Sequence, residues 1–410
     1  MVSTVADLCG IADYTRTVVE ALVNIGVDVA VHSLDRERRN QQGFYRRLAS
    51  ELCSSSADLI HLQHEYSFFG GVIPPLADVR VLRRAGFPLL APSSYFDFVD
   101  RITLPMVVTC HEVSGPARVS RARHGVRHSL ASAIERESTS LTFQAADQVI
   151  CHGDTRVRML ADLGVAPQRL RMIPAGIPAL SPPPRASARA ALGVEDRFVL
   201  LSYGFVSPRK QIEMQIDAVA ALPRTAILVV AGAILGDSRY LSKLSAHAES
   251  RGVSDRVRFV GEVSDSEKLT WLAAADLGLV TPVGMGAAST SINACAGAGV
   301  PVIASALPEA NELQGRMHCL DLVSPGNCDQ LVSRILFWMA HHEELAHARR
   351  ATLASLRLAT PAAEAGSTVQ VYNDALRGTR PRHRGWSWVA LARRYYAEGL
   401  CDRAVTPPLL

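Results

Sequence analysis

Two adjacent cations follow a predicted strand in residues 199–211 (VLLSYGFVSPRKQ). Gly204 at the end of this strand allows close approach of the backbone, and Pro208 sets up a turn that presents Arg209 and Lys210. An arginine can hold phosphate oxygens through two parallel hydrogen bonds, and a lysine acts as a point charge. The pair therefore suits a diphosphate, with a solvated charged turn as the alternative.

A second motif with phosphate chemistry lies in residues 282–299 (PVGMGAASTSINACAGAG). Ser289, Thr290 and Ser291 stand where a helix is expected to begin, and serine and threonine are favoured helix caps. Free backbone N–H groups and hydroxyls at a helix start form an anion site, although in the alternative they only cap the helix. Both motifs fall on one predicted sheet, so we expect them to converge on one anion.

The elements that must position these motifs alternate along the whole chain. Short runs rich in Val, Ile and Leu are apolar throughout, as in parallel strands that are covered on both faces. Strands are expected at 28–32, 58–63, 105–110, 147–151, 170–173, 198–203, 226–231, 257–260, 276–281 and 300–304. Helices are expected at 13–25, 210–221, 239–251, 265–274 and 290–297. This alternation predicts an α/β fold with doubly wound parallel sheets.

A change in composition divides the chain in two. Residues 181–187 (SPPPRAS) predict a stiff joint that neither helix nor sheet tolerates. We therefore expect one Rossmann-like domain at 1–181, a second at 182–360, and a C-terminal helix and tail at 361–410. A doubly wound sheet binds ligands at the carboxyl ends of its strands, so a cleft between two facing sheets is the expected binding place.

The composition is that of a globular protein, since 48% of the 410 residues are hydrophobic and 20% are charged. A formal net charge of +4, without a basic stripe that carries aromatics, gives no case for nucleic-acid binding. The eight cysteines include no C-x-x-C pair, so neither a zinc site nor a redox dithiol is expected, and a reducing cytoplasm is the simplest location. We expect no signal peptide at MVSTVADLCG and no membrane span, which needs about 18–20 apolar residues.

Several further segments form a pattern through their order and spacing along the chain. In the first half they are CGIADYT (9–15), ADLIHLQHEYSFFGG (57–71), MVVTCHEV (106–113), ADQVICHGDTRVRMLADLGV (146–165) and RMIPAGIP (171–178). In the second half they are SYGFVSPRKQIE (202–213), RVRFVGEVSDSEKLTWLAAADLGLVTP (256–282) and AGAGVPVIAS (296–305). In this combination, over roughly residues 9–320, the chain resembles the retaining GT-B glycosyltransferases of the family-four type, glycosyl transferases group 1.

The resemblance implies a nucleotide-sugar site in the second domain. Lys210, with Arg209, would neutralise the leaving diphosphate, and the hydroxyl residues at 289–291 would bind the same phosphates. Gly204 would allow the donor close to the backbone. The base would be held, largely through backbone, by Val260, Gly261 and Glu262.

The first domain would form the acceptor side. Gly10 would let the backbone approach phosphate and acceptor, and His111, at the tip of its strand, would lie against the transferred sugar. An enzyme of this kind needs no metal, because positive side chains and a helix dipole stabilise the departing diphosphate. We therefore expect no metal site and no cofactor other than the sugar-nucleotide substrate.

The chain departs from the family pattern around the phosphate helix. The group often carries two glutamates eight residues apart, the second of which holds the ribose, and here Gly286 and Ala294 stand at those positions. Phe205 replaces the usual arginine after the strand's glycine, and Arg209 would substitute for it in part. A branch of the group uses a small Ser/Gly/Thr-rich turn instead, which STSINACAGAG resembles.

A histidine-rich segment, HLQHEY (61–66), resembles a metal cluster at first sight. Successive strand residues point to opposite faces, so His61 and His64 are not expected to bind one metal. We expect His64, Glu65 and Tyr66 to be loop residues near the acceptor, with hydrogen-bonded packing as the alternative.

Two basic segments are less specific. The run 117–129 (ARVSRARHGVRHS) is either a solvated loop or a contact for an anionic acceptor or membrane headgroups. The tail 378–410 places tryptophans and tyrosines among basic residues, which suits packing of the last helix on the first domain. A peripheral membrane helix is the other interpretation of the tail.

The sequence as a whole favours a cytoplasmic hexosyl- or amino-hexosyltransferase that retains the anomeric configuration. The resemblance favours UDP as the donor nucleotide, with a small secondary metabolite or a glycan as hydroxyl acceptor. One alternative is a non-hydrolysing sugar-nucleotide epimerase, which needs a carboxylate pair that we do not find. The other is a catalytically silent partner, which the missing glutamates favour and the retained His111, Arg209 and Lys210 oppose.

Overall fold

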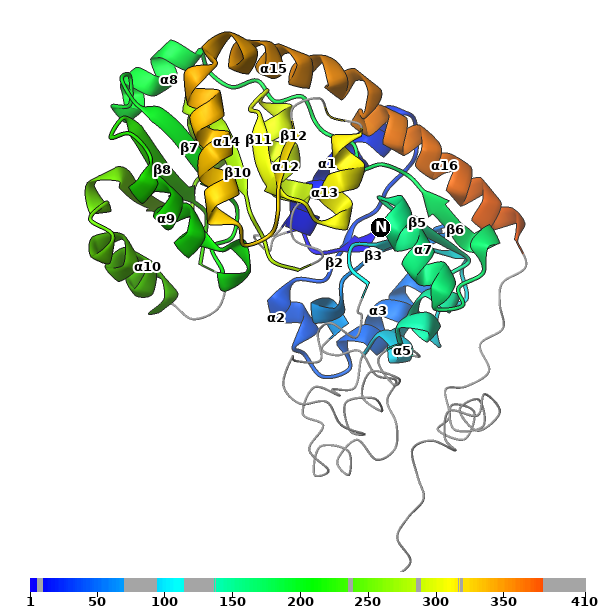
Figure 1. Ribbon diagram of the computed structural model, residues 1–410. Helices are drawn as coiled ribbons and strands as arrows, with labels where there is room; N and C mark the ends of the chain where they lie inside the picture. The colour runs from blue at the N-terminus through cyan, green and yellow to red at the C-terminus, as the bar shows by residue number, and fades with distance from the viewer. Residues whose placement is uncertain are drawn as a thin grey trace, which may run out of the picture. The chain divides into compact units, whose positions relative to one another are not determined.

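The computed structural model describes residues 1–5, 10–69, 94–113, 136, 138–234, 239–284, 289–315, 317 and 320–378. The chain divides into two compact units (Figure 1). The first contains Met1–Pro174 and Ala365–Leu410, and the second contains Ala175–Glu364. Each unit is built on a six-stranded sheet whose neighbouring strands run parallel.

The sheet of the first unit has the order β2-β1-β3-β4-β5-β6. Its strands are β1 (Val2–Ser3), β2 (His32–Ser33), β3 (Ile60–His64), β4 (Met106–Cys110), β5 (Gln148–Cys151) and β6 (Leu170–Met172). The helices are α1 (Gly10–Asn24), α2 (Arg36–Arg39), α3 (Phe44–Cys53), α5 (Ser94–Val99) and α7 (Asp154–Asp162), with short 3-10 helices η1 (Tyr66–Phe69) and η2 (Pro167–Arg169).

Both faces of this first sheet are covered. Val108 in β4 joins an apolar cluster with Leu52 and Phe143, whereas its neighbour Val107 joins a second cluster with Leu22 of α1. This alternation follows from the two-residue period of a strand. All five residues of β3 and all five of β4 are buried, although β3 alternates apolar Ile60 and Leu62 with polar residues.

The sheet of the second unit has the order β12-β11-β10-β7-β8-β9. Its strands are β7 (Phe198–Tyr203), β8 (Ala226–Ala231), β9 (Val257–Gly261), β10 (Leu277–Val280), β11 (Val302–Ser305) and β12 (Leu320–Val323). The helices are α8 (Arg185–Leu192), α9 (Ile212–Ala221), α10 (Arg239–Ser250), α11 (Asp265–Ala274), α12 (Ser289–Gly297), α13 (Pro308–Gln314), α14 (Cys328–Ala340) and α15 (His342–Ser355). Short 3-10 helices are η3 (Pro208–Lys210), η4 (Ser254–Arg256) and η5 (Leu356–Leu358).

The last described helix, α16 (Pro361–Arg377), belongs to the first unit from Ala365 onward. Its residues Val371, Tyr372 and Ala375 pack in the same cluster as Leu22 of α1. Arg171 of β6 also forms an ion pair with Asp374 of α16, with a nitrogen–oxygen distance of 3.0 Å. The helix is therefore part of the core that covers one face of the first sheet.

The expected boundaries that differ from the structure include those of one strand, one helix and the joint between the units. The strand expected at 28–32 is confined to His32–Ser33, because its described neighbour, β1, offers only two paired residues. The helix expected at 210–221 begins at Ile212, after the 3-10 turn η3. Within the proline-rich segment 181–187, the residues from Arg185 onward already form α8, and the two units change at Pro174–Ala175.

Candidate functional site

The strand order of the second sheet reverses between β7 and β10. Strand β7 pairs with β8 on one side and β10 on the other, and the chain winds outward from this pair in both directions. Such a switch point leaves a crevice at the carboxyl ends of the two strands, where doubly wound sheets bind their ligands. The two segments that are expected to bind phosphate follow these strands, one after β7 and the other after β10.

The two motifs meet at the carbonyl of Tyr203, the last residue of β7. The Lys210 ammonium donates a hydrogen bond to this oxygen at 2.6 Å, and the Ser291 hydroxyl donates to it at 2.8 Å. Lys210 is partly buried and Ser291 is only 5% exposed. The ammonium and the hydroxyl at the start of α12 thus lie beside one another. We call Lys210, Ser291, Gly204 and the Tyr203 carbonyl the β7 cluster.

Gly204 leaves the space in which this cluster forms. A Cβ atom at Gly204 would lie 2.9 Å from the Lys210 nitrogen and 2.9 Å from the Ser291 oxygen. The residue also has φ +96°, which favours glycine. Behind it, a Cβ on Gly232 would lie 2.3 Å from the Gly204 carbonyl oxygen, so these two backbones touch. Both glycines are required by close approach.

The turn that carries the two cations is fixed to the end of β10. The Val283 N–H donates to the Arg209 carbonyl at 2.9 Å, and the Thr281 hydroxyl donates to the Lys210 carbonyl at 3.0 Å. The chain then enters α9 through Gln211, which has φ +52° and is the one described non-glycine residue with positive φ. These contacts, rather than helix propensity, set the position of Lys210.

Burial changes the protonation of Lys210. It lowers the pKa of the ammonium from 10.5 to about 8, and the neighbouring Cys295 partly opposes this shift. The lysine therefore remains mostly charged at pH 7, in a place where a bound anion would stabilise the charge. Arg209 has an exposed side chain at the same turn, and Thr290 is exposed at the start of α12. The side chain of Ser289 lies outside the described residues.

The expected base-binding loop ends the edge strand β9. The N–H of Gly232 donates to the carbonyl of Gly261 at 2.7 Å, and Gly261 has φ +73°. Val260 packs against the apolar core of the second unit, and the side chain of Glu262 is exposed. The structure thus places Gly261 and Glu262 at the carboxyl edge of the sheet that carries the β7 cluster.

His111 follows directly on β4, at the carboxyl edge of the first sheet. Its Nε2 atom lies 2.8 Å from Oε1 of Gln63. The ring packs edge-on against Tyr14, with centroids 5.0 Å apart, and lies 5.7 Å from the ring of His152. Burial, followed by the charges of His152 and Arg156, holds the pKa of His111 well below its ordinary 6.5, so the ring is neutral. Gly10 is the first residue of α1 in this unit.

His64 and Tyr66 are core residues, which corrects the expectation that they are loop residues near the acceptor. His64 ends β3, is 1% exposed and stacks on Phe69 with centroids 5.7 Å apart. Tyr66 is 4% exposed and donates to the Thr139 hydroxyl at 3.3 Å. The backbone N–H of Ser67 donates to Glu65 at 2.8 Å. His64 and Tyr66 therefore fit the alternative interpretation, in which these residues pack in the core.

The histidines at 61 and 64 face opposite sides of the sheet, as the strand period predicted. His61 contacts Tyr372 of α16, whereas His64 lies in the aromatic cluster on the other face. No group of three or more potential metal ligands occurs among the described residues. No described helix is long and apolar enough to cross a membrane. Gly286, the run 117–129 and the tail from residue 379 lie outside the described residues.

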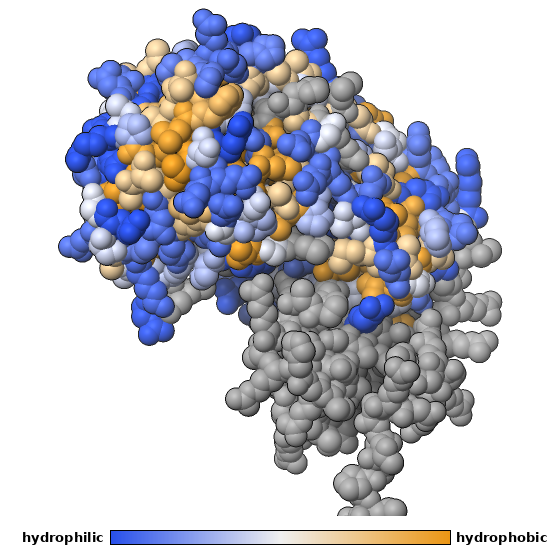
Figure 2. Space-filling model, viewed as in Figure 1, coloured by the Kyte–Doolittle hydropathy of each residue, from blue (hydrophilic) through white to orange (hydrophobic). Residues whose placement is uncertain are grey.

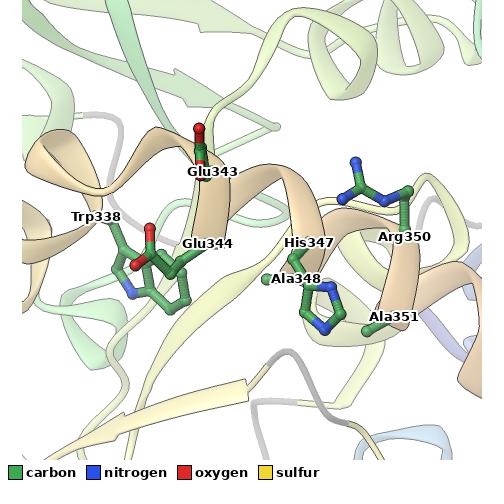
Figure 3. Close-up of a pocket in the computed structure, with 7 residues that line it drawn as sticks. All are labelled: Trp338, Glu343, Glu344, His347, Ala348, Arg350 and Ala351. Atoms are coloured by element: carbon green, nitrogen blue, oxygen red, sulfur yellow. The ribbon is translucent and has the colours of Figure 1, made fainter.

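A separate open pocket lies on the outer helices of the second unit. Trp338 of α14 and Glu343, Glu344, His347 and Arg350 of α15 line it, and none of them belongs to the β7 cluster (Figure 3). Figure 2 shows apolar residues over α14 amid hydrophilic surface, and Leu336 of this helix is 40% exposed. The carboxyl edge of the sheet, not this surface, carries the predicted chemistry.

Two family models match the chain in succession. The model described as Glycosyltransferase Family 4 matches residues 9–179, and the model described as Glycosyl transferases group 1 matches residues 185–353. Curated relatives include D-inositol 3-phosphate glycosyltransferases. The protein from Mycobacterium sp. (strain KMS) is 28% identical over 214 residues, which are 51% of this chain and 47% of the relative. The protein from Mycobacterium tuberculosis (strain H37Ra) is 29% identical over 215 residues, 51% of this chain and 43% of the relative. The chain thus spans about half the length of the curated relatives it matches.

Solved structures match most of the chain. Anabaena Alr3699/HepE in complex with UDP and glucose has a TM-score of 0.62 at 18% identity, over 86% of this chain and 88% of that one. Sucrose-phosphate synthase from Thermosynechococcus elongatus has a TM-score of 0.66 at 20% identity, over 91% and 97%. At these low sequence identities, the structural similarity shows the fold alone. They confirm the expected GT-B fold class, α/β with doubly wound sheets.

Proposed function

We propose, on the premise that this chain belongs to the group 1 glycosyltransferases of the family-four type, that it transfers a hexose or amino-hexose from a nucleoside diphosphate sugar to a hydroxyl acceptor. UDP is the proposed donor nucleotide, and the proposed mechanism retains the anomeric configuration without a metal. The observation that carries the proposal is the meeting of Lys210 and Ser291 over Gly204 at the switch point of the second sheet.

The β7 cluster has the chemistry of a diphosphate site. It combines a charged ammonium, a hydroxyl, and the start of α12, whose first backbone N–H groups carry partial positive charge. The Lys210 and Ser291 donors share one neutral carbonyl acceptor. Phosphate oxygens are stronger acceptors for both donors because hydrogen bonds to ionised groups are about twice as strong as neutral ones.

The remaining residues complete the donor site in the proposal. The exposed Arg209, on the same turn as Lys210, binds the same diphosphate, and Thr290 adds a hydroxyl or a backbone N–H at the helix start. Gly261 and Glu262, at the same edge of the sheet, hold the base mainly through backbone atoms. His111 of the first unit contacts the transferred sugar as a neutral ring.

The transfer step follows from these roles. The bond between the anomeric carbon and the diphosphate oxygen breaks, and Lys210 and the α12 start stabilise the negative charge that develops on the diphosphate. The acceptor hydroxyl attacks the anomeric carbon on the face that the diphosphate leaves, and its proton goes to a phosphate oxygen. The configuration is thereby retained, and the cationic residues perform the role for which other transferases use a metal ion.

A catalytically silent nucleotide-sugar binder is the second candidate, and Ala294 favours it. This residue stands in α12 where the family often has a ribose-binding glutamate, and its methyl group cannot accept a hydrogen bond from a ribose hydroxyl. The silent binder and the enzyme both predict nucleotide binding at the β7 cluster. They differ only in whether sugar transfer follows.

A thermal-shift screen against UDP, GDP, ADP and dTDP with their sugars tests the proposal. A nucleotide at about 100 times its Kd stabilises the protein by about 2.7 kcal/mol, which is a readily measured shift in Tm. We expect a shift with UDP and its sugars, and we expect Lys210→Ala to remove it while Lys243→Ala, at an exposed lysine of α10, does not. If no nucleotide or nucleotide sugar in the panel raised the Tm, the proposed donor site would be wrong. A shift without turnover on a panel of hydroxyl acceptors would select the silent binder.

A further inference from the structure

A line of polar side chains lies buried beneath His111 in the first unit. His61 and Gln63 lie two residues apart on β3 and so share one face of the sheet. His61 is 3% exposed, and Gln63 and Thr109 of β4 have no exposed surface. Burying a polar group is costly unless it is hydrogen-bonded, so each member of this line needs a hydrogen-bond partner.

The partners form one connected chain. Nδ1 of His61 lies 2.6 Å from the Tyr372 hydroxyl on α16, and its Nε2 lies 2.7 Å from the Thr109 hydroxyl. The Gln63 amide nitrogen lies 3.3 Å from the same Nε2 of His61. The Gln63 amide oxygen, in turn, lies 2.8 Å from Nε2 of His111. The chain therefore leads from Tyr372 through His61 and Gln63 to His111.

The direction of each hydrogen bond is set by the glutamine. An amide oxygen only accepts, so His111 must donate from Nε2, and its Nδ1 atom then carries a lone pair. The amide nitrogen only donates, so Nε2 of His61 accepts, and Nδ1 of His61 donates to Tyr372. Burial lowers the pKa of His61 to about 3, which keeps this ring neutral with a single ring proton.

The ring plane of His111 is constrained as well. Tyr14 lies edge-on to it at an interplanar angle of 78°, and the ring of His152 lies on another side at 48°. Nδ1 of His152 lies 3.0 Å from the Ile173 carbonyl, which holds that ring in turn. Among the described residues no hydrogen bond occupies Nδ1 of His111.

We infer that Gln63, His61 and Tyr372 are positioning residues that hold His111 as the Nε2-protonated tautomer, so that its Nδ1 accepts a hydrogen bond from a hydroxyl group of the bound sugar. The role at the sugar rests on the proposed function, whereas the tautomer does not. His111 thus acts as a hydrogen-bond acceptor that orients a hydroxyl group, and not as a proton donor.

The tautomer can be measured on the intact protein without any substrate. Nitrogen NMR of histidine-labelled protein distinguishes a protonated ring nitrogen from an unprotonated one, and His111→Gln identifies the signals of His111. We expect a protonated Nε2 and an unprotonated Nδ1 in the wild type. The reverse pattern, or an equal mixture of both tautomers, would overturn the inference even if the protein proved to be an active transferase.

Variants then test whether the chain sets the tautomer. Gln63→Met keeps the side-chain volume but removes the hydrogen bonds of the amide to His61 and His111. Tyr372→Phe removes only the hydroxyl at the far end, so it serves if the first variant does not fold. We expect both tautomers of His111 in Gln63→Met, and a tautomer change at His61 or exchange broadening of its signals in Tyr372→Phe. Gln168→Met, at an exposed glutamine of η2, is the matched control and leaves both patterns unchanged. If both test variants kept the wild-type tautomers of His61 and His111, the positioning role would be refuted.

Kinetic measurements distinguish a loss of His111 positioning from a general disturbance of the fold. Loss of one oriented hydrogen bond corresponds to about a tenfold fall in kcat/KM for sugar transfer. Because the β7 cluster shares no residue with the histidine chain, UDP affinity should stay at the wild-type value in Gln63→Met. An equal fall in UDP affinity would contradict the positioning role. A wild type that binds UDP but transfers no sugar would refute the proposed function and leave the NMR result standing.

Discussion

Replacing Gly204 by alanine tests the β7 cluster with one methyl group. The new Cβ would stand 2.9 Å from both the Lys210 nitrogen and the Ser291 oxygen, which is closer than carbon atoms approach such groups. The ammonium ends a flexible side chain and can swing away, whereas the serine hydroxyl is fixed to α12. We therefore expect the methyl group to displace Lys210 first and to occupy space that a phosphate oxygen needs.

The magnitudes separate the effect on folding from the effect on binding. A φ of +96° costs a non-glycine residue about 1–2 kcal/mol in the folded state. A lost hydrogen bond to an ionised group costs about 1.5–3 kcal/mol, which weakens UDP binding about 10- to 150-fold if one contact is lost. Stability should thus fall modestly, and donor affinity should fall much more.

Gly252→Ala is the matched control for Gly204→Ala. Gly252 has φ +67°, and a Cβ atom there would meet nothing within 4 Å, so this variant carries the backbone strain without the obstruction. Calorimetric titration with UDP and chemical unfolding of both variants give the two quantities. We expect similar losses of stability and a loss of affinity only for Gly204→Ala. Wild-type UDP affinity in a folded Gly204→Ala protein would refute the assignment of the β7 cluster.

Three further outcomes follow from the same site. Lys210→Ala should cut sugar transfer more than tenfold, since a hydrogen bond from a charged group is worth about 1.5–3 kcal/mol, and unchanged turnover would remove Lys210 from the site. UDP affinity should fall as pH rises through about 8, because the lysine loses its proton there and a bound diphosphate favours the protonated form. Lys210→Met should abolish this pH dependence, and a slope that persists in the variant would assign it to another group. EDTA should leave transfer intact, and its loss on chelation would contradict the metal-free mechanism.

Strand positions in the second unit could be predicted closely from the sequence. The expected strands 198–203 and 226–231 coincide with β7 and β8, because each is a single apolar run between turn residues. The expected helix 265–274 coincides with α11, whose capping box joins Ser264 to Glu267. The expected position of strand β2 was wrong, because the length of this edge strand depends on β1, its neighbour in the sheet, which lies about 30 residues away in the sequence.

The site itself could be predicted only in part. That Lys210 and Ser291 meet follows from the winding rule, because both motifs end neighbouring strands of one sheet. That they share the Tyr203 carbonyl could not be deduced, because no side-chain pattern marks a main-chain acceptor. The line from Tyr372 to His111 was missed for a similar reason. Its one local signal is the spacing of His61 and Gln63 on a single strand face, and its other end is 311 residues away.

The contact between Gly232 and Gly204 has a consequence for anyone who redesigns this chain. Gly232 follows β8 and contacts Gly204 through the carbonyl behind the β7 cluster. Any side chain at 232 would collide with that carbonyl, so the backbone at Gly204 would have to shift. A position outside the proposed ligand contacts can therefore abolish the proposed donor binding, and libraries that aim at new donors should hold both positions constant together.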